Sequence, residues 1–178
     1  ARPGDEVWVS GWIGSAAAGL GALAHGDAAG IGPGPEHPVA AYLTPEPRVR
    51  LGQLLGRNRA ATACIDLSDG LADGLRQLVA ASGVGMVVTG ETLPIAPGAR
   101  QWFTAQHADP VRAALRGGDD YELLFTVARR RQSRFVSVRR LIGDVPVTRI
   151  GRVTDDGEVR LEYAGGVEPV CDGYEHFR

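Results

Sequence analysis

The chain has 178 residues, of which 44% are hydrophobic and 22% charged, and its formal net charge at pH 7 is −2. This length and composition predict one globular domain over residues 1–178 with a core of its own. The small negative charge gives no electrostatic reason to expect nucleic acid or an anionic membrane as a partner, because a basic excess normally meets such partners.

The cysteines and the apolar runs bear on where the protein is found. Cys64 and Cys171 form neither a CxxC pair nor the framework of a small secreted domain, which favours a reducing cytoplasm. No apolar run approaches the ~20 residues of a membrane span. The chain opens with ARPGD and without an initiator methionine, so we expect a piece of a longer protein.

The first third of the chain predicts a strand and short helices around a loop. Residues 6–13 favour a strand that leads into a turn at Gly14, and a helix of small residues follows over residues 16–25. Residues 26–38 are rich in glycine and proline, which predicts a loop. Short helices are expected over residues 39–43 and up to Gly56.

The stretch 61–73 carries the first concentration of polar chemistry. Residues 61–67 predict a short buried strand that passes, near Ser68, into a helix over residues 69–82. The start of a helix binds anions through its dipole and unpaired N–H groups, and carboxylates such as those of Asp66 and Asp69 bind Mg²⁺. These groups suit a metal-bridged phosphate. The alternative is that Ser68 or Asp69 caps the helix and Asp66 is a turn residue.

A further strand is expected over residues 85–89. Strand, helix and strand in this order imply a right-handed crossover if the two strands are parallel neighbours. Helices are then predicted over residues 99–107 and from Asp109 to the glycine pair at 117–118.

A second acidic run, GGDDYE at residues 117–122, leads directly into an apolar strand over residues 123–127. The two glycines permit a tight turn, and neighbouring residues such as Asp119 and Asp120 place their carboxylates on opposite sides of the chain. One carboxylate can therefore face a pocket while the other braces the loop. The alternative is a solvated turn before a strand.

The last part of the chain predicts a helix and a hairpin. Six arginines between residues 129 and 140 accompany an apolar helix face, and we interpret them as a solvated face rather than a phosphate-binding patch. Residues 147–153 and 158–163 predict a hairpin with its turn at residues 155–157. Aromatic residues near the end are expected to dock on the core, or else to stack on a heterocyclic ligand.

Several motifs, in order along nearly the whole chain, resemble the C-terminal domain of thiamine-monophosphate kinases. These enzymes belong to a wider superfamily with aminoimidazole ribonucleotide synthetase, selenophosphate synthetase and the hydrogenase maturation carbamoyl dehydratase. The matching runs are ARPGD at 1–5, PEPRV at 45–49, IDLSDGL at 65–71, GGDDYELLFT at 117–126 and GYEHF at 173–177. The resemblance implies an α+β fold, a mixed β-sheet covered by helices, of the C-terminal domain type of the aminoimidazole ribonucleotide synthetase superfamily.

The activity that the resemblance implies is transfer of the γ-phosphoryl group of ATP to thiamine monophosphate, which gives thiamine diphosphate and ADP. Mg²⁺ ions would bridge the phosphates. By matching position, Asp66 and Asp69 would be Mg²⁺ ligands and Ser68 an ATP contact.

The acceptor, thiamine monophosphate, would be contacted by the first acidic residue of the second motif, which is Asp119 here. Tyr174 or Phe177, in the terminal segment, would line the same pocket.

The chain departs from the family pattern at two points. Gly74 stands where the family usually has an acidic residue, with Asp73 one position early, so the role of that carboxylate does not carry over. The N-terminal domain that supplies most metal ligands, much of the ATP site and the dimer interface in the family is absent from this chain. We therefore expect half of a cytoplasmic enzyme that is a homodimer when complete, and a fragment that folds without catalysing.

Two other functions fit the same motifs. One is another ATP-dependent enzyme of the superfamily, either selenophosphate synthetase-like or carbamoyl dehydratase-like. The other is a non-catalytic module that binds a phosphorylated ligand.

Overall fold

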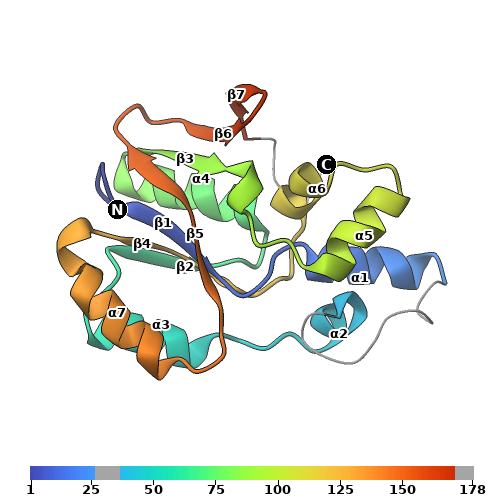
Figure 1. Cartoon of the computed structure of the whole chain (residues 1–178), viewed down its shortest axis with the longest axis horizontal. Coiled ribbons are helices and arrows are strands. Elements are labelled where there is room, and N and C mark those ends of the chain that lie inside the picture. The colour runs from blue at the N-terminus through green and yellow to red at the C-terminus, as the bar shows by residue number, and fades with distance from the viewer. Residues whose placement is uncertain (27–36, 171–178) are drawn as a thin grey trace.

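The computed structural model describes residues 1–26 and 37–170, which form a seven-stranded mixed sheet covered by helices (Figure 1). The strands lie in the order β2-β4-β1-β5-β3-β6-β7. This arrangement confirms the predicted α+β class. Most of the loop predicted over residues 26–38, and both Tyr174 and Phe177, lie outside the described residues.

Most predicted elements are present, with ends shifted by a few residues. The strands are β1 (Glu6–Ser10), β2 (Ala63–Asp66), β3 (Gly85–Thr89), β4 (Leu123–Val127), β5 (Val147–Thr154), β6 (Val159–Tyr163) and β7 (Gly166–Pro169). The helices are α1 (Ser15–Ala24), α2 (Pro38–Leu43), α3 (Val49–Arg57), α4 (Leu71–Ser82), α5 (Pro97–Ala105), α6 (Pro110–Arg116) and α7 (Gln132–Leu141), with short 3₁₀ helices η2 (Gly90–Thr92) and η3 (Arg129–Arg131).

Side chains pack against both faces of the sheet. Successive side chains of a strand point to opposite faces, so one strand contributes to the cores on both sides. In β1, Val7 and Val9 join a core with α4, α5 and α6, whereas Trp8 between them packs on the other side. In β4, Leu124 belongs to the first core and Phe125 to the second, which also contains buried residues of α3 and α7. The strands β1 and β4 are therefore central and hold both layers together.

Strand β2 is not the buried strand that the sequence predicts. It pairs with β4, and within residues 1–26 and 37–170 its other edge has no strand partner, so Cys64 and Asp66 are exposed. The conditional crossover does not form either, because β4, β1 and β5 lie between β2 and β3. The chain thus places residues 61–67 at the rim of the sheet, where their side chains can meet a ligand.

The predicted hairpin over residues 147–163 is wrong. Strand β3 lies between its two arms, antiparallel to β5 and parallel to β6. Four of the five residues of β3 are buried, and a strand of this kind needs a partner on each side. Strand β6 makes its own hairpin with β7.

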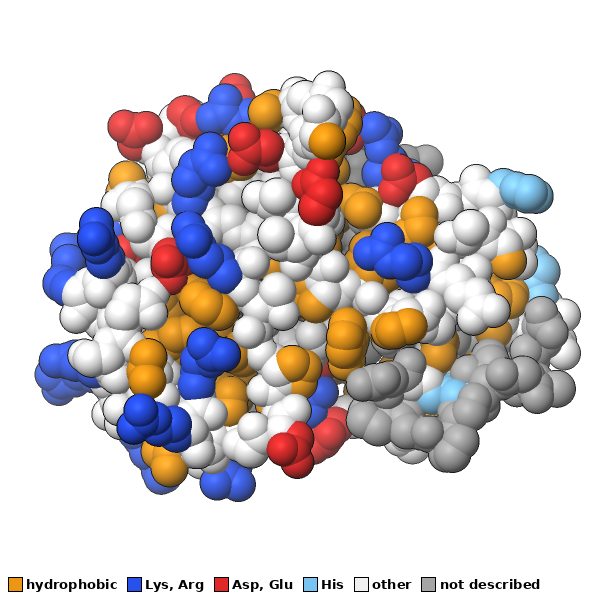
Figure 2. Space-filling model, viewed as in Figure 1, with side chains coloured by type: hydrophobic (Ala, Val, Ile, Leu, Met, Phe, Trp, Pro, Cys, Tyr) orange, Lys and Arg blue, Asp and Glu red, His pale blue; other side chains and the backbone are white. Residues whose placement is uncertain are grey.

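The outward sides of α3 and α7 carry arginines, which gather at the left and lower left of Figure 2. In α7, Phe135 and Val138 are buried against the sheet, while Arg134, Arg139 and Arg140 are exposed. Five of the six arginines predicted to form a solvated face are thus exposed, whereas Arg131 is half-buried and donates a hydrogen bond to the carbonyl of Ala61. Among the helices that the structure describes, none is long and apolar enough to cross a membrane.

Candidate functional site

The two acidic motifs, at residues 66–70 and 117–122, lie against each other where β2 and β4 meet. Asp66 pairs with Leu123 in the sheet, and the contact continues beyond it through backbone hydrogen bonds. The N–H of Asp119 donates to the carbonyl of Ser68 at 2.7 Å, and the N–H of Tyr121 donates to the carbonyl of Leu67 at 3.0 Å. Motifs about 50 residues apart in the sequence therefore form one structural unit.

Glycines make this close approach possible. Gly70 has a φ of +93°, and a Cβ atom there would lie 2.4 Å from the carbonyl oxygen of Gly117. A Cβ atom on Gly118 would lie 3.0 Å from the carbonyl oxygen of Ser68. Side chains at these positions would force the motifs apart, so each motif contributes a glycine that the contact requires.

The neighbouring carboxylates of the second motif point to different places, as the sequence predicts. Asp119 is exposed, whereas Asp120 accepts hydrogen bonds from the N–H groups of Gly14 at 2.8 Å and Ala16 at 3.3 Å. These N–H groups lie at the start of α1, where no side chain of the helix itself supplies a cap. Asp120 thus braces the loop and caps α1 from a distance of more than 100 residues in the chain.

Burial raises the pKa of Asp120 from 3.8 to about 7, and the charges of Glu122 and Asp119 act in the same direction. The hydrogen bonds from Gly14 and Ala16 oppose this shift without cancelling it. The brace consequently changes its charge near neutral pH.

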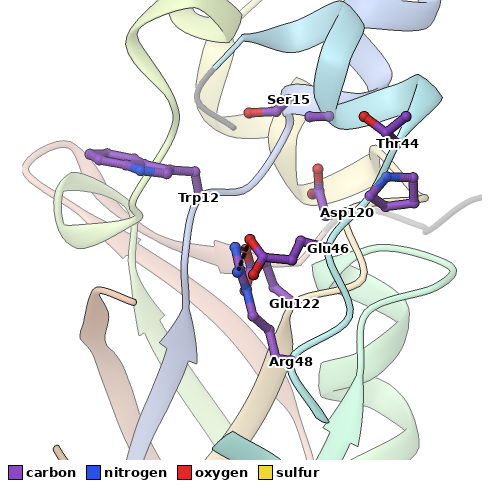
Figure 3. A pocket seen from close by; sticks show the side chains of 9 residues that line it. Trp12, Ser15, Thr44, Glu46, Arg48, Asp120 and Glu122 are labelled. Carbon is purple, nitrogen blue, oxygen red and sulfur yellow. Dashed lines mark hydrogen bonds and ion pairs between the residues drawn. The ribbon is translucent and has the colours of Figure 1, made fainter. Parts of the chain in front are cut away.

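Glu122 anchors the other end of the motif. Its carboxylate accepts two hydrogen bonds from Arg48, at 2.8 and 2.7 Å, and one from the Ser10 hydroxyl at 2.5 Å. Figure 3 shows Glu46, Arg48 and Glu122 converging beside a small pocket, with Asp120 nearer the start of α1. A Cβ atom on Gly11 would lie 1.8 Å from Glu122 Oε1, so the buried carboxylate also needs that glycine.

On the other side of the motif, a cleft of about 490 Å³ opens between α1, α6 and the two acidic runs. Its apolar wall consists of Ala16, Ala17, Leu20 and Ala113, and its polar side of Ser68, Asp69, Arg116, Gly117, Gly118, Asp119 and Tyr121. A cleft with one aliphatic wall and several charged groups suits a small organic molecule that also carries a polar or charged group.

Three of the predicted site residues, Ser68, Asp69 and Asp119, line this cleft together. Asp66 is exposed at the end of β2. The charge of Asp119 in the cleft raises the pKa of Tyr121, and the charges of Asp66 and Asp69 act in the same direction. The predicted aromatic contacts Tyr174 and Phe177 lie outside the described residues, so their positions stay predictions.

The alternative in which Ser68 or Asp69 caps α4 is not what the structure shows. The helix begins after Gly70, which is its N-cap residue and offers no side chain as a cap. Gly70, and not Ser68 or Asp69, thus occupies the N-cap position of α4.

Sequence reasoning did not assign a role to Tyr121, Arg116, Arg48 or Glu122. Tyr121 and Glu122 belong to the same acidic run as Asp119, and this position in the sequence is the feature that could have indicated a role for them. Nothing in the local sequence indicates that Arg48 contacts Glu122, because 74 residues separate them.

Within residues 1–26 and 37–170, no three His, Cys, Asp or Glu side chains lie close enough together to hold a metal ion. Asp66 and Asp69 are two carboxylates at one rim, and Mg²⁺ commonly takes only one or two protein carboxylates together with waters and substrate phosphates. These residues therefore fit a shared Mg²⁺ site and do not form an all-protein cage.

Comparison with known sequences identifies a family. The family model described as AIR synthase related protein, C-terminal domain, matches residues 2–164. The thiamine-monophosphate kinase of Salmonella typhimurium is 37% identical over 183 residues, which cover 99% of this chain and 54% of that protein. The thiamine-monophosphate kinase of Halobacterium salinarum is 36% identical over 177 residues, with 99% and 54% covered. The chain thus spans about half the length of these relatives.

Solved structures give the same result. The crystal structure of thiamine-monophosphate kinase from Stenotrophomonas maltophilia K279a has a TM-score of 0.78 and 36% identity, and the match covers 91% of this chain and 51% of that one. AaThiL complexed with AMPPCP and TMP also has a TM-score of 0.78, with 30% identity, and the match covers 99% of this chain and 52% of that one.

Proposed function

Because the chain belongs to the family of AIR synthase related proteins, through their C-terminal domain, we propose that it is the C-terminal half of a thiamine-monophosphate kinase. The complete enzyme would transfer the γ-phosphoryl group of ATP to thiamine monophosphate. The named relatives and the neighbour bound to AMPPCP and TMP support this proposal. The observation that carries it is the union of the two acidic motifs around one cleft.

The first motif would act on the phosphates. Asp66 and Asp69 would hold Mg²⁺ at the rim, and Ser68 would contact ATP from the turn between them. The support is their common position at the open edge of the sheet, outside the N-cap position of α4, which Gly70 occupies. Bound Mg²⁺ would neutralise charge on the transferring phosphoryl group, which is the main demand of such a transfer.

The second motif would act on the acceptor. Asp119 lines the cleft and would contact thiamine monophosphate, while Asp120 caps α1 and Glu122 pairs with Arg48 in the same motif. A terminal aromatic residue, Tyr174 or Phe177, would complete the pocket. Arg116 at the rim adds a positive charge where a phosphate can approach.

The chain offers only part of what the transfer needs. Among the described residues, two carboxylates and one arginine line the cleft, whereas a transferring phosphoryl group needs its charge neutralised on several sides. We therefore propose that an N-terminal domain supplies the remaining metal ligands and most of the ATP site, in a cytoplasmic enzyme that is a homodimer when complete.

A substrate panel tests this function. The complete protein is given ATP labelled on its γ-phosphate, together with Mg²⁺ and one acceptor at a time: thiamine monophosphate, selenide or an aminoimidazole precursor. Label should pass to thiamine monophosphate alone. Label on selenide, or labelled inorganic phosphate released only in the presence of the aminoimidazole precursor, would instead favour a different enzyme of the superfamily. Binding of nucleotide or acceptor with neither transfer nor acceptor-dependent release of phosphate would favour a binding module.

A further inference from the structure

Tyr121 lines the cleft in a conformation that its side chain does not favour. Its φ is +50°, in the left-handed region, and Asp119 two residues earlier has a φ of +64°. Non-glycine residues seldom adopt this region, and a bulky residue there marks strain. Tyr121 is also 37% exposed. Strain of this kind persists where the surrounding structure imposes it and often marks a functional position.

The surroundings of Tyr121 do impose the conformation. Its own N–H is bonded to Leu67, the residue before it caps α1, and the residue after it is held by Arg48. Tyr121 itself lines the cleft. The loop therefore places Tyr121 at the wall of the cleft, where a bound ligand can contact it.

The chemistry around the ring selects a class of ligand. The Tyr121 hydroxyl lies 3.4 Å from Asp119 Oδ1. The Asp119 carboxylate is the main reason that the pKa of the Tyr121 phenol is raised, so the ring lies beside a negative charge. Aliphatic side chains of α1 form another wall of the cleft. An aromatic face, carboxylates and an aliphatic wall together favour a positively charged flat ring over a neutral one.

We propose that Tyr121 is an acceptor-recognition residue, whose ring stacks on the positively charged heterocycle of the acceptor beside Asp119. The inference rests on the proposed function, since thiamine monophosphate contains a permanently positive thiazolium ring. It adds a residue and a discrimination by charge to the roles assigned above.

The test compares three variants in the complete enzyme by calorimetry. Y121L removes the aromatic face, Y121F removes only the hydroxyl, and Y163L is the matched control. Tyr163 is 38% exposed and its hydroxyl lies 3.3 Å from Glu168, but it lies outside the cleft. The ligands are thiamine monophosphate, ATP, and thiochrome monophosphate as an uncharged relative of the acceptor.

We expect Y121L to raise the Kd of thiamine monophosphate about tenfold, the size of an ordinary cation–π contact with stacking. The Kd of ATP should stay within about twofold, the Kd of thiochrome monophosphate should rise much less than that of the charged acceptor, and Y163L should bind as the wild type does. Y121F should lose less acceptor affinity than Y121L, because it keeps the aromatic face. Unchanged acceptor binding by Y121L, an equal loss in Y163L, or an equal loss for the uncharged ligand would each overturn the inference.

The outcome separates the inference from the function on which it rests. If the wild-type enzyme phosphorylates thiamine monophosphate and Y121L binds it normally, the inference fails and the function stands. If the wild-type enzyme does not bind thiamine monophosphate, both fail. A structural role is tested in the present chain with Y121G, because glycine adopts positive φ without strain. The melting temperature of Y121G should equal or exceed that of the wild type, and a clear decrease would show that the ring is kept for stability.

Discussion

Arg48 and Glu122 form a bidentate ion pair, with Nε to Oε2 at 2.8 Å and Nη2 to Oε1 at 2.7 Å. Their side chains are only 13% and 6% exposed. The pair ties the segment that precedes α3 to the end of the second acidic motif, and the hydrogen bond to Glu122 is the main reason that the pKa of Arg48 is raised. One buried contact thus fixes the base of the loop that carries Asp119.

Removing one partner of this pair should destabilise the fold strongly. R48M keeps similar length but leaves the buried Glu122 carboxylate without its cation, which costs about 3–5 kcal/mol of unfolding free energy. R112M is the control, because the Arg112–Glu168 pair is more exposed and should contribute less than about 1 kcal/mol. Urea unfolding measures both. Equal losses of unfolding free energy in R48M and R112M would show that the buried ion pair stabilises the fold no more than the exposed pair does.

The brace at Asp120 should make stability depend on pH. The folded pKa of about 7 lies above the ordinary value of 3.8, so the folded state binds more protons between these values. Stability from this group is therefore full below about pH 4 and is lost as the pH rises through 7. At ~1.4 kcal/mol per pKa unit, the loss is at most about 4 kcal/mol.

The variant D120N should remove this part of the pH dependence, since its side chain does not titrate. D144N is the control, because Asp144 is exposed, does not cap α1 and is not among the charges that shift the pKa of Asp120. The measurement is the free energy of unfolding between pH 4 and 8 for all three proteins. A D120N profile with the same slope as the wild type would mean that other groups cause the dependence.

The metal role of the first motif predicts a loss of turnover. In the complete enzyme, D66N or D69N removes a charge next to the transferring phosphate while keeping the size of the side chain, so kcat should fall about 10²-fold or more at limiting Mg²⁺. Excess Mg²⁺ should restore part of the activity. If both variants keep near-normal turnover at limiting Mg²⁺, these carboxylates are not ligands.

The acceptor role of Asp119 predicts a selective loss of binding. D119A should weaken thiamine monophosphate by about tenfold, the usual cost of one charged contact, and leave ATP nearly unchanged. D144A, an exposed aspartate after α7, controls for the change in net charge. Calorimetry that found the ATP affinity lowered and the acceptor affinity intact would reverse the assignment.

The sequence predicted the elements more accurately than their pairing. Local periodicity identified β4 and α4 because each side-chain pattern depends on its own segment. It could not reveal that β3 lies between β5 and β6, since that order depends on long-range contacts. The same limit explains why the sequence predicts a buried strand over residues 61–67. Their apolar character can be read from the segment itself, whereas their place at the edge of the sheet depends on long-range pairing.

The candidate site was predictable where its chemistry is continuous in sequence. Asp119 and Asp120 are neighbours in the chain, and the sequence analysis places their side chains on opposite sides of it. One was therefore expected to face a pocket and the other to brace the loop. The anchors Arg48 and Ser10 belong to other segments, and only the folded chain brings them to Glu122. The strain at Tyr121 was also hidden, because a φ angle imposed by distant hydrogen bonds leaves no local pattern.

The central claim is that this chain carries the acceptor side and part of the metal site of a kinase, and that another domain completes it. The most direct measurement is the formation of thiamine diphosphate from ATP, Mg²⁺ and thiamine monophosphate, by the complete protein and by this chain alone. The account predicts product from the complete protein and none from this chain, which should still unfold cooperatively with a melting temperature insensitive to ATP and Mg²⁺. Turnover by the purified chain, with contaminating kinase excluded, or no product from the complete protein, would contradict it.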